Sequence, residues 1–265
     1  MKIEVKGNQV NYQLEGPLSA PVLMLSHSLA THLTLWDPQV ESLAKEFRIL
    51  RYDITGHGGS DVPSEPTTLD ELAGQAGGLL DLLGIRQVHF LGLSLGAMIG
   101  QTLALKQPER LAGLLLCGAT CRIPAEAQPL WQERIRIAES EGMEPLVEPT
   151  IARWFTPQFR TAHPDIVERV RGMIRATAPL GYAGCCRAIA RFDLAARIHA
   201  ISLPTMIIVG EADQAMPVAM SRAVQERIAG SELVIIPSAS HLSNTEQPEA
   251  FNRAVITFLK RTTGR

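Results

Sequence analysis

The chain has 265 residues, 46% of them hydrophobic, and a formal net charge of −2 at pH 7. This length suffices for one large domain, or for a core domain with an inserted piece, around a substantial buried core. The near-neutral charge and the lack of any block of Lys and Arg exclude proteins that bind nucleic acids or anionic membranes through charge, and leave small neutral or mildly acidic ligands.

Residues 2–15 alternate polar and apolar side chains around Gly7-Asn8, which predicts an antiparallel hairpin at the start of the chain. The same residues lack the apolar core and cleavage site of a signal peptide, and no later run is long enough to span a membrane. We therefore expect a cytoplasmic protein. The cysteines at positions 117, 121, 185 and 186 lack the spacing of a metal site, so we expect reduced thiols and no metal.

Apolar runs typical of buried strands then alternate with segments typical of helices. The expected strands are at residues 21–27, 48–53, 88–93, 111–118, 205–210 and 233–237. The expected helices are at residues 36–47, 69–83, 97–106, 217–229 and 248–260. This alternation predicts the α/β class, with a mostly parallel, twisted sheet flanked by helices on both faces.

The alternation is interrupted between Arg122 and Ile198, where the pattern favours helices only, at residues 130–141, 146–155, 165–176 and 181–192. We expect a helical insertion at residues 122–198 in a core made of residues 1–121 and 199–265. Long excursions from a compact core are commonly lids over a functional site. A lid is therefore the predicted role of this insertion.

An apolar run from Val88 to Leu93 leads into the pattern Gly-x-Ser-x-Gly at residues 92–96, just before the expected helix. This arrangement is typical of a nucleophile elbow, a tight turn that holds a serine in a strained conformation with its hydroxyl exposed. Gly92 and Gly96 leave room where strand and helix nearly collide. The pattern predicts Ser94 as a nucleophile; five residues alone leave a flexible turn as the alternative.

Two late strands are followed by an acid, Asp213, and by a histidine, His241. The order Ser94, Asp213, His241 is that of the catalytic triad in α/β hydrolases. A serine hydroxyl is a poor nucleophile until a neutral imidazole takes its proton, and a carboxylate fixes the tautomer of that imidazole. Glu211 is the alternative acid from position alone.

Such a triad needs two amide donors for the oxyanion, and we expect these from Leu95 and Leu29. His27, in the same loop as Leu29, is expected to hold that loop by a hydrogen bond, and His57, in a Gly-rich turn, to be structural. The triad requires no cofactor, and no dinucleotide or Walker motif is present. The remaining histidines are expected as scattered surface or core residues: His32, His89, His163 and His199.

Several stretches together resemble the 3-oxoadipate enol-lactonases, a family of α/β hydrolases in the β-ketoadipate route of aromatic breakdown. They span most of the chain, and the two within the insertion, where relatives with other substrates diverge, make the resemblance specific. The stretches are residues 25–31 (LSHSLAT), 35–39 (LWDPQ), 50–53 (LRYD), 56–58 (GHG), 92–96 (GLSLG), 153–157 (RWFTP), 181–186 (GYAGCC), 240–244 (SHLSN) and 246–248 (EQP).

The resemblance implies a small lactone substrate that carries a carboxylate, opened through an acyl-enzyme. An anionic substrate calls for a cation in the pocket. Arg134 is our candidate, because it lies three residues after Trp131 and so on nearly the same face of a helix; a solvated surface arginine is the alternative. Trp131 and Trp154 are candidate substrate-binding residues, with simple core packing as their other interpretation.

Three positions depart from the family pattern, which usually has Asn at His27, Gly at Ala30 and Arg at Thr55. These departures leave open a relative that acts on a different lactone or ester. A carboxylesterase and a C–C bond hydrolase of the aromatic meta-cleavage type share the core, lid and triad. A non-catalytic receptor for a small molecule is the hypothesis from another class, and an intact triad argues against it.

Overall fold

The computed structural model describes residues 1–63 and 67–263. Within them, eight strands form one sheet in the order β1-β2-β4-β3-β5-β6-β7-β8. The predicted hairpin is formed by β1 and β2; β2 also pairs antiparallel with β4, and the later neighbours are all parallel. The strands are β1 (Lys2–Val5), β2 (Asn8–Glu15), β3 (Val22–Ser26), β4 (Arg48–Tyr52), β5 (Val88–Leu93), β6 (Leu111–Cys117), β7 (Thr205–Gly210) and β8 (Glu232–Ile236).

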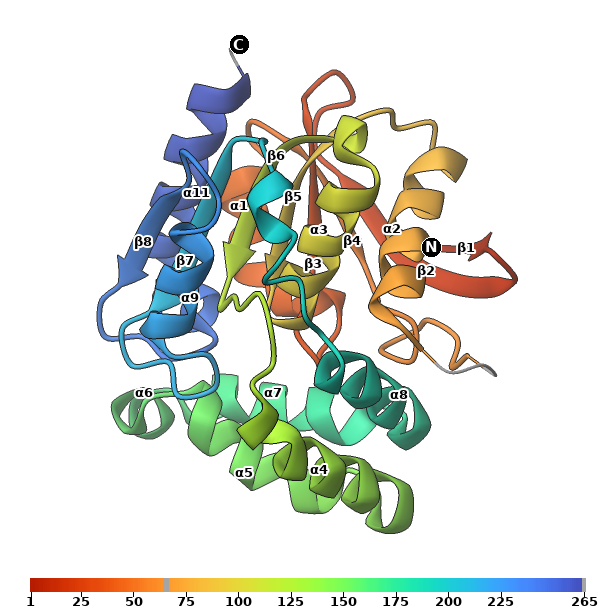
Figure 1. Ribbon diagram of the computed structural model, residues 1–265, viewed down its shortest axis with the longest axis vertical. Helices are drawn as coiled ribbons and strands as arrows, with labels where there is room; N and C mark the ends of the chain where they lie inside the picture. The colour runs from red at the N-terminus through yellow and green to blue at the C-terminus, as the bar shows by residue number, and fades with distance from the viewer. Residues whose placement is uncertain (64–66, 264–265) are drawn as a thin grey trace.

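Helices cover both faces of this sheet (Figure 1). Helix α2 packs against α3 on one side, and α1 packs against α11 on the other. The predicted α/β architecture is therefore confirmed. These helices are α1 (Asp37–Leu43), α2 (Leu69–Leu82), α3 (Leu95–Lys106), α9 (Val218–Gln225), α10 (Ser243–Glu246) and α11 (Pro248–Thr263). None of the helices that the structure describes combines the length and apolar character needed to cross a membrane.

Between β6 and β7 the chain leaves the sheet and forms helices that lie beyond the carboxyl ends of the parallel strands (Figure 1). The ends of this segment pair with each other: the Leu194 N–H donates to Cys121 O at 2.7 Å, and the Ile123 N–H donates to Phe192 O at 2.9 Å. Entry to and exit from the segment are thus side by side. Its helices are α4 (Gln128–Glu141), α5 (Glu144–Trp154), α6 (Pro157–Ala162), α7 (Pro164–Ala176) and α8 (Pro179–Ala190).

Two of the predicted helices are wrong in extent. The expected helix over residues 36–47 is a 3₁₀ turn, Leu33–Trp36, followed by α1, which ends at Leu43. Helix α1 thus begins one residue from the expected start, with Pro38 in its first turn, where the missing N–H of proline costs no hydrogen bond, and it ends four residues early. Helix α9 ends at Gln225, short of the predicted end at Ala229.

The inserted helices contact the core through two glycines. Gly56, in the turn after β4, has a φ of +82°, and a Cβ on it would lie 2.6 Å from the Cα of Gly181 in α8. Neither position can carry a side chain without a shift of the facing backbone. This close approach fixes how near α8 lies to the sheet.

Replacing Gly181 by Ala should lower the free energy of unfolding by about 1–3 kcal/mol, because the new methyl group overpacks against the Gly56 backbone. Gly172, an exposed residue of α7, is the matched control, since a Cβ there meets nothing within 4 Å. Gly172→Ala should raise stability by up to about 1 kcal/mol through helix propensity. Urea unfolding of the two variants tests this; equal stabilisation by both would contradict the tight contact.

Candidate active site

Ser94 lies at the turn from β5 into α3, with a φ of 55°. A residue with a side chain rarely adopts this left-handed conformation, so the backbone is strained, as the elbow pattern predicts. The Ser94 N–H donates to Cys117 O in β6 at 2.8 Å, which helps to hold the strained residue. The elbow conformation is confirmed, and the role of Ser94 as a nucleophile stays a prediction.

Gly92 and Gly96, two residues before and after Ser94, let the backbones of β3, β5 and α3 approach one another closely. A Cβ on Gly92 would lie 2.6 Å from the Ala97 nitrogen, and a Cβ on Gly96 would lie 2.7 Å from the carbonyl carbon of Ser26. The Gly96 N–H donates to His27 O at 3.2 Å. The elbow is thereby joined to the loop after β3, where the second oxyanion donor is expected.

Asp213 and His241 meet below the surface, at 5% and 2% exposure. The His241 Nδ1–H donates to Asp213 Oδ2 at 2.8 Å. The other carboxylate oxygen, Oδ1, accepts the N–H groups of Ala215 and Met216, both at 2.8 Å. With Nδ1 protonated toward Asp213, Nε2 carries the lone pair, which is the tautomer that a general base requires.

Glu211, the alternative acid, is exposed and accepts the Ser238 N–H at 3.2 Å. Asp213 is therefore the acid beside His241. Sequence reasoning missed Gly118, which has a φ of +54° and where a Cβ would lie 2.9 Å from His241 Cε1. The sequence did offer a signal for this residue. Gly118 directly follows a buried strand, and functional sites of parallel sheets form at the carboxyl ends of the strands.

Ser94 and His241 line the same pocket, which has a volume of about 100 Å³. Leu29 lies in its wall, and Leu95 is the first residue of α3, where the N–H has no acceptor within the helix. Most of the remaining lining is apolar. It includes Met98, Ile123, Leu130, Ile189, Met216 and Met220.

The cationic and aromatic candidates of the insertion also line this pocket. The Arg134 guanidinium lies 4.7 Å from the centroid of the Trp131 ring, a cation–π contact that orients it. Trp154 lies with its ring centroid 6.1 Å from that of His241. A second arginine, Arg153, lines the pocket as well. Sequence reasoning missed it, although it opens the stretch Arg-Trp-Phe-Thr-Pro used for the resemblance.

His27 holds the loop before Leu29, as expected. Its Nε2 accepts the Ile54 N–H at 2.9 Å, so Nδ1 carries the proton and donates it to Ser28 O at 2.7 Å. Burial lowers the pKa of His27 to about 3, which keeps the ring neutral. The loop that follows β3 is thus tied to the loop that follows β4.

The other histidines lie apart from this pocket's lining. His57 is buried, 5.5 Å from the His27 ring, and burial lowers its pKa to about 3. His32 and His89 have their pKa lowered by burial, and His163 and His199 are exposed. Within residues 1–63 and 67–263, no three His, Cys, Asp or Glu side chains are grouped to hold a metal ion. The four cysteines are buried free thiols.

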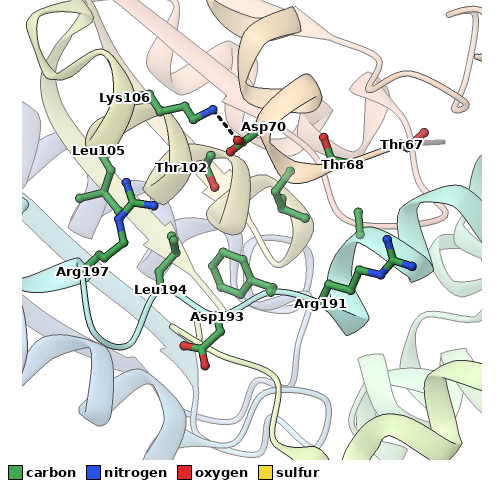
Figure 2. A pocket seen from close by; sticks show the side chains of 13 residues that line it. Thr67, Thr68, Asp70, Thr102, Leu105, Lys106, Arg191, Asp193, Leu194 and Arg197 are labelled. Carbon is green, nitrogen blue, oxygen red and sulfur yellow. Dashed lines mark ion pairs between the residues drawn. The ribbon is translucent and has the colours of Figure 1, made fainter. Parts of the chain in front are cut away.

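A larger pocket of about 270 Å³ lies where α8 and its following turn meet α2 and α3. Figure 2 shows Arg191 and Arg197 at opposite ends of it, and Lys106 turned toward Asp70, its ion-pair partner. The charged groups do not converge on one point. None of the predicted catalytic residues lines this second pocket.

The chain is similar over nearly its whole length to known hydrolases. A family model for the alpha/beta hydrolase fold matches residues 21–248. The 3-oxoadipate enol-lactonase 2 of Acinetobacter baylyi is 37% identical over 252 residues, 95% of this chain and 93% of that protein. The crystal structure of the enol-lactonase from Burkholderia xenovorans LB400 is 37% identical, with a TM-score of 0.95, and covers 98% of this chain and 100% of its own. A malate-bound esterase from Thermogutta terrifontis is 30% identical, with a TM-score of 0.93 over 99% of each chain.

The neutral, buried His27 makes stability depend on pH. Its pKa is about 3 when folded and about 6.5 when unfolded, so its contribution is complete above pH 6.5 and is lost as the pH falls toward 3. The free energy of unfolding should fall by at most about 1.4 kcal/mol per pH unit for this group. In His27→Asn that part of the slope should vanish between pH 6.5 and 4.5, in urea unfolding curves.

His57 contributes a slope of the same sign, which remains in His27→Asn. The exposed His199 supplies the control, because His199→Asn should keep the parent slope. Identical slopes for the parent and for His27→Asn would show that the pKa of His27 is not lowered in the folded protein.

Proposed function

Since the chain belongs to the α/β-hydrolase family and, within it, to the 3-oxoadipate enol-lactonases, we propose that it opens 3-oxoadipate enol-lactone to 3-oxoadipate. The reaction would serve the breakdown of aromatic compounds. One observation carries the mechanism: His241, hydrogen-bonded to Asp213, lines the same pocket as the strained Ser94. The catalytic triad of this proposal is Ser94, His241 and Asp213.

In the first step, Ser94 Oγ attacks the lactone carbonyl carbon while His241 Nε2 takes the hydroxyl proton. The Leu95 and Leu29 N–H groups donate to the tetrahedral oxyanion, and the N-terminus of α3 adds a favourable dipole. Collapse of the intermediate breaks the ring C–O bond. His241 protonates the departing enol oxygen, and the enol becomes a ketone.

In the second step, His241 deprotonates a water molecule, which attacks the acyl carbon attached to Ser94. The C–O bond to Ser94 breaks, the serine regains its proton from His241, and a keto dicarboxylate leaves. Asp213 stabilises the imidazolium formed in both steps. The two backbone N–H groups that donate to its Oδ1 hold the carboxylate in place.

Residues 122–198 serve as the lid in this proposal, since they supply much of the pocket wall above Ser94. Arg134 binds the substrate carboxylate, with Trp131 orienting the guanidinium and Trp154 covering His241. The apolar remainder of the lining contacts the rest of the substrate in this proposal.

A carboxylesterase is the second candidate function. The observation that favours it is the similarity to the esterase from Thermogutta terrifontis, together with the largely apolar lining of the pocket. The two candidates share the triad and differ in the charge of the preferred substrate, because a simple esterase prefers neutral esters. Comparing freshly generated enol-lactone with a short-chain nitrophenyl ester separates them.

Replacing Ser94 by Ala should lower kcat for the lactone at least about 10⁴-fold, because it removes the hydroxyl that forms the acyl-enzyme in this mechanism. Asp213→Asn should cost about 10⁴-fold through the wrong histidine tautomer. The matched acid variant Glu211→Gln should keep the parent rate. Steady-state hydrolysis of both substrates measures all three; ester cleavage without lactone cleavage by the parent protein would favour the esterase.

Replacing Arg134 by Gln should raise KM for the anionic lactone about 10-fold, the effect of losing one charge-assisted hydrogen bond. KM for the neutral nitrophenyl ester should not change. Arg136→Gln, on the outer face of the same helix and paired with Glu133, controls for the loss of a positive charge. The same measurement on Arg153→Gln compares the two arginines of the pocket, and an unchanged KM in Arg134→Gln would remove Arg134 from the binding site.

A further inference from the structure

A buried carboxylate outside the triad connects the histidine loop to the insertion. Glu246, the last residue of α10, is 5% exposed. Its Oε1 accepts both the N–H and the hydroxyl of Thr156, each at 2.8 Å, and its Oε2 accepts the Ser240 N–H. All three partners are donors, so the group acts as an ionised acceptor on both oxygens.

Burial raises the pKa of Glu246, with a further contribution from the charge of Asp213, while the three donors oppose this shift. A carboxylate is costly to bury unless it is hydrogen-bonded, and the three donors offset that cost for Glu246. The arrangement here joins residues far apart in the chain. Thr156 lies in the insertion between α5 and α6, and Ser240 directly precedes His241.

Two further hydrogen bonds join the same two segments. The Ser240 hydroxyl donates to Arg153 O at 3.0 Å, and the Leu242 N–H donates to Trp154 O at 3.2 Å. His241 is therefore flanked on both sides by bonds to the end of α5. The side chains of Arg153 and Trp154 line the substrate pocket, so the backbone that presents the pocket wall also positions the histidine.

We propose that Glu246 is a positioning residue that fastens the His241 loop to the insertion, so that the triad is aligned only while the α5–α6 corner is docked. This inference rests on the proposed function, because it assigns His241 as the base. Glu246 itself touches no reacting atom. It acts by holding Ser240 and Thr156, and a displacement of the histidine by about 1 Å would suffice to cost about 100-fold in rate.

The test is Glu246→Gln, which keeps the size of the side chain but turns one acceptor into a donor that faces another donor. We expect kcat to fall about 10- to 100-fold, with KM within about twofold of the parent value. Thr156→Val removes the hydroxyl bond from the insertion side and should lower kcat about 3- to 10-fold. Glu249→Gln is the matched control, since this nearby acid is exposed; its kcat should not change.

If Glu246 acts through Thr156, adding Thr156→Val to Glu246→Gln should cause little further loss of kcat. The low-field proton resonance of the His241–Asp213 hydrogen bond should broaden or shift in Glu246→Gln and stay unchanged in Glu249→Gln. Should Glu246→Gln fail to fold, Thr156→Val and its resonance carry the test. Parent kcat in both single variants, or a changed KM alone, overturns the proposal.

Failure of this inference differs from failure of the proposed function. A Ser94→Ala variant that retains activity overturns the triad itself. An inactive Ser94→Ala beside a fully active Glu246→Gln overturns only the positioning role.

Discussion

At Ser94 the backbones of β3, β5 and α3 approach one another so closely that Gly92 and Gly96 can carry no side chain. The crossing forces Ser94 into a strained conformation, and hydrogen bonds from neighbouring segments hold it there. The same crossing places the N-terminus of α3 beside the serine hydroxyl. The proposed nucleophile, one of the two proposed oxyanion donors and the favourable helix dipole therefore arise from a single steric constraint.

His241 and Asp213 are held in a different way from Ser94. Buried hydrogen bonds position them, whereas close backbone packing positions Ser94. Asp213 orients the ring through one oxygen and is itself held by two backbone donors through the other. Gly118 leaves the space that lets the ring lie against the end of β6. Hydrogen bonds break more readily than a sterically fixed backbone yields, so conformational change can disturb this half of the proposed triad more easily than Ser94.

Sequence patterns were sufficient for the fold and for proposing the three residues of the triad, because each follows a parallel strand and the sheet brings the strand ends together. They did not reveal Gly118, Arg153 or Glu246 as site residues. The surroundings of these three arise from packing between distant segments, which leaves no periodicity in the chain. The sequence patterns also placed the start of α1 to within one residue but not its early end at Leu43.

The three departures from the family pattern act at different distances from the pocket. Ala30 lines it and has a φ of 58°, a conformation that glycine adopts at less cost, so this substitution adds strain to the oxyanion loop. His27 stabilises the same loop through Ser28 O. Thr55 bonds to Gln75 and lines a separate pocket beside α2. Two departures thus concern the placement of the proposed oxyanion donor Leu29, whereas the proposed substrate contacts come from α4 and α5.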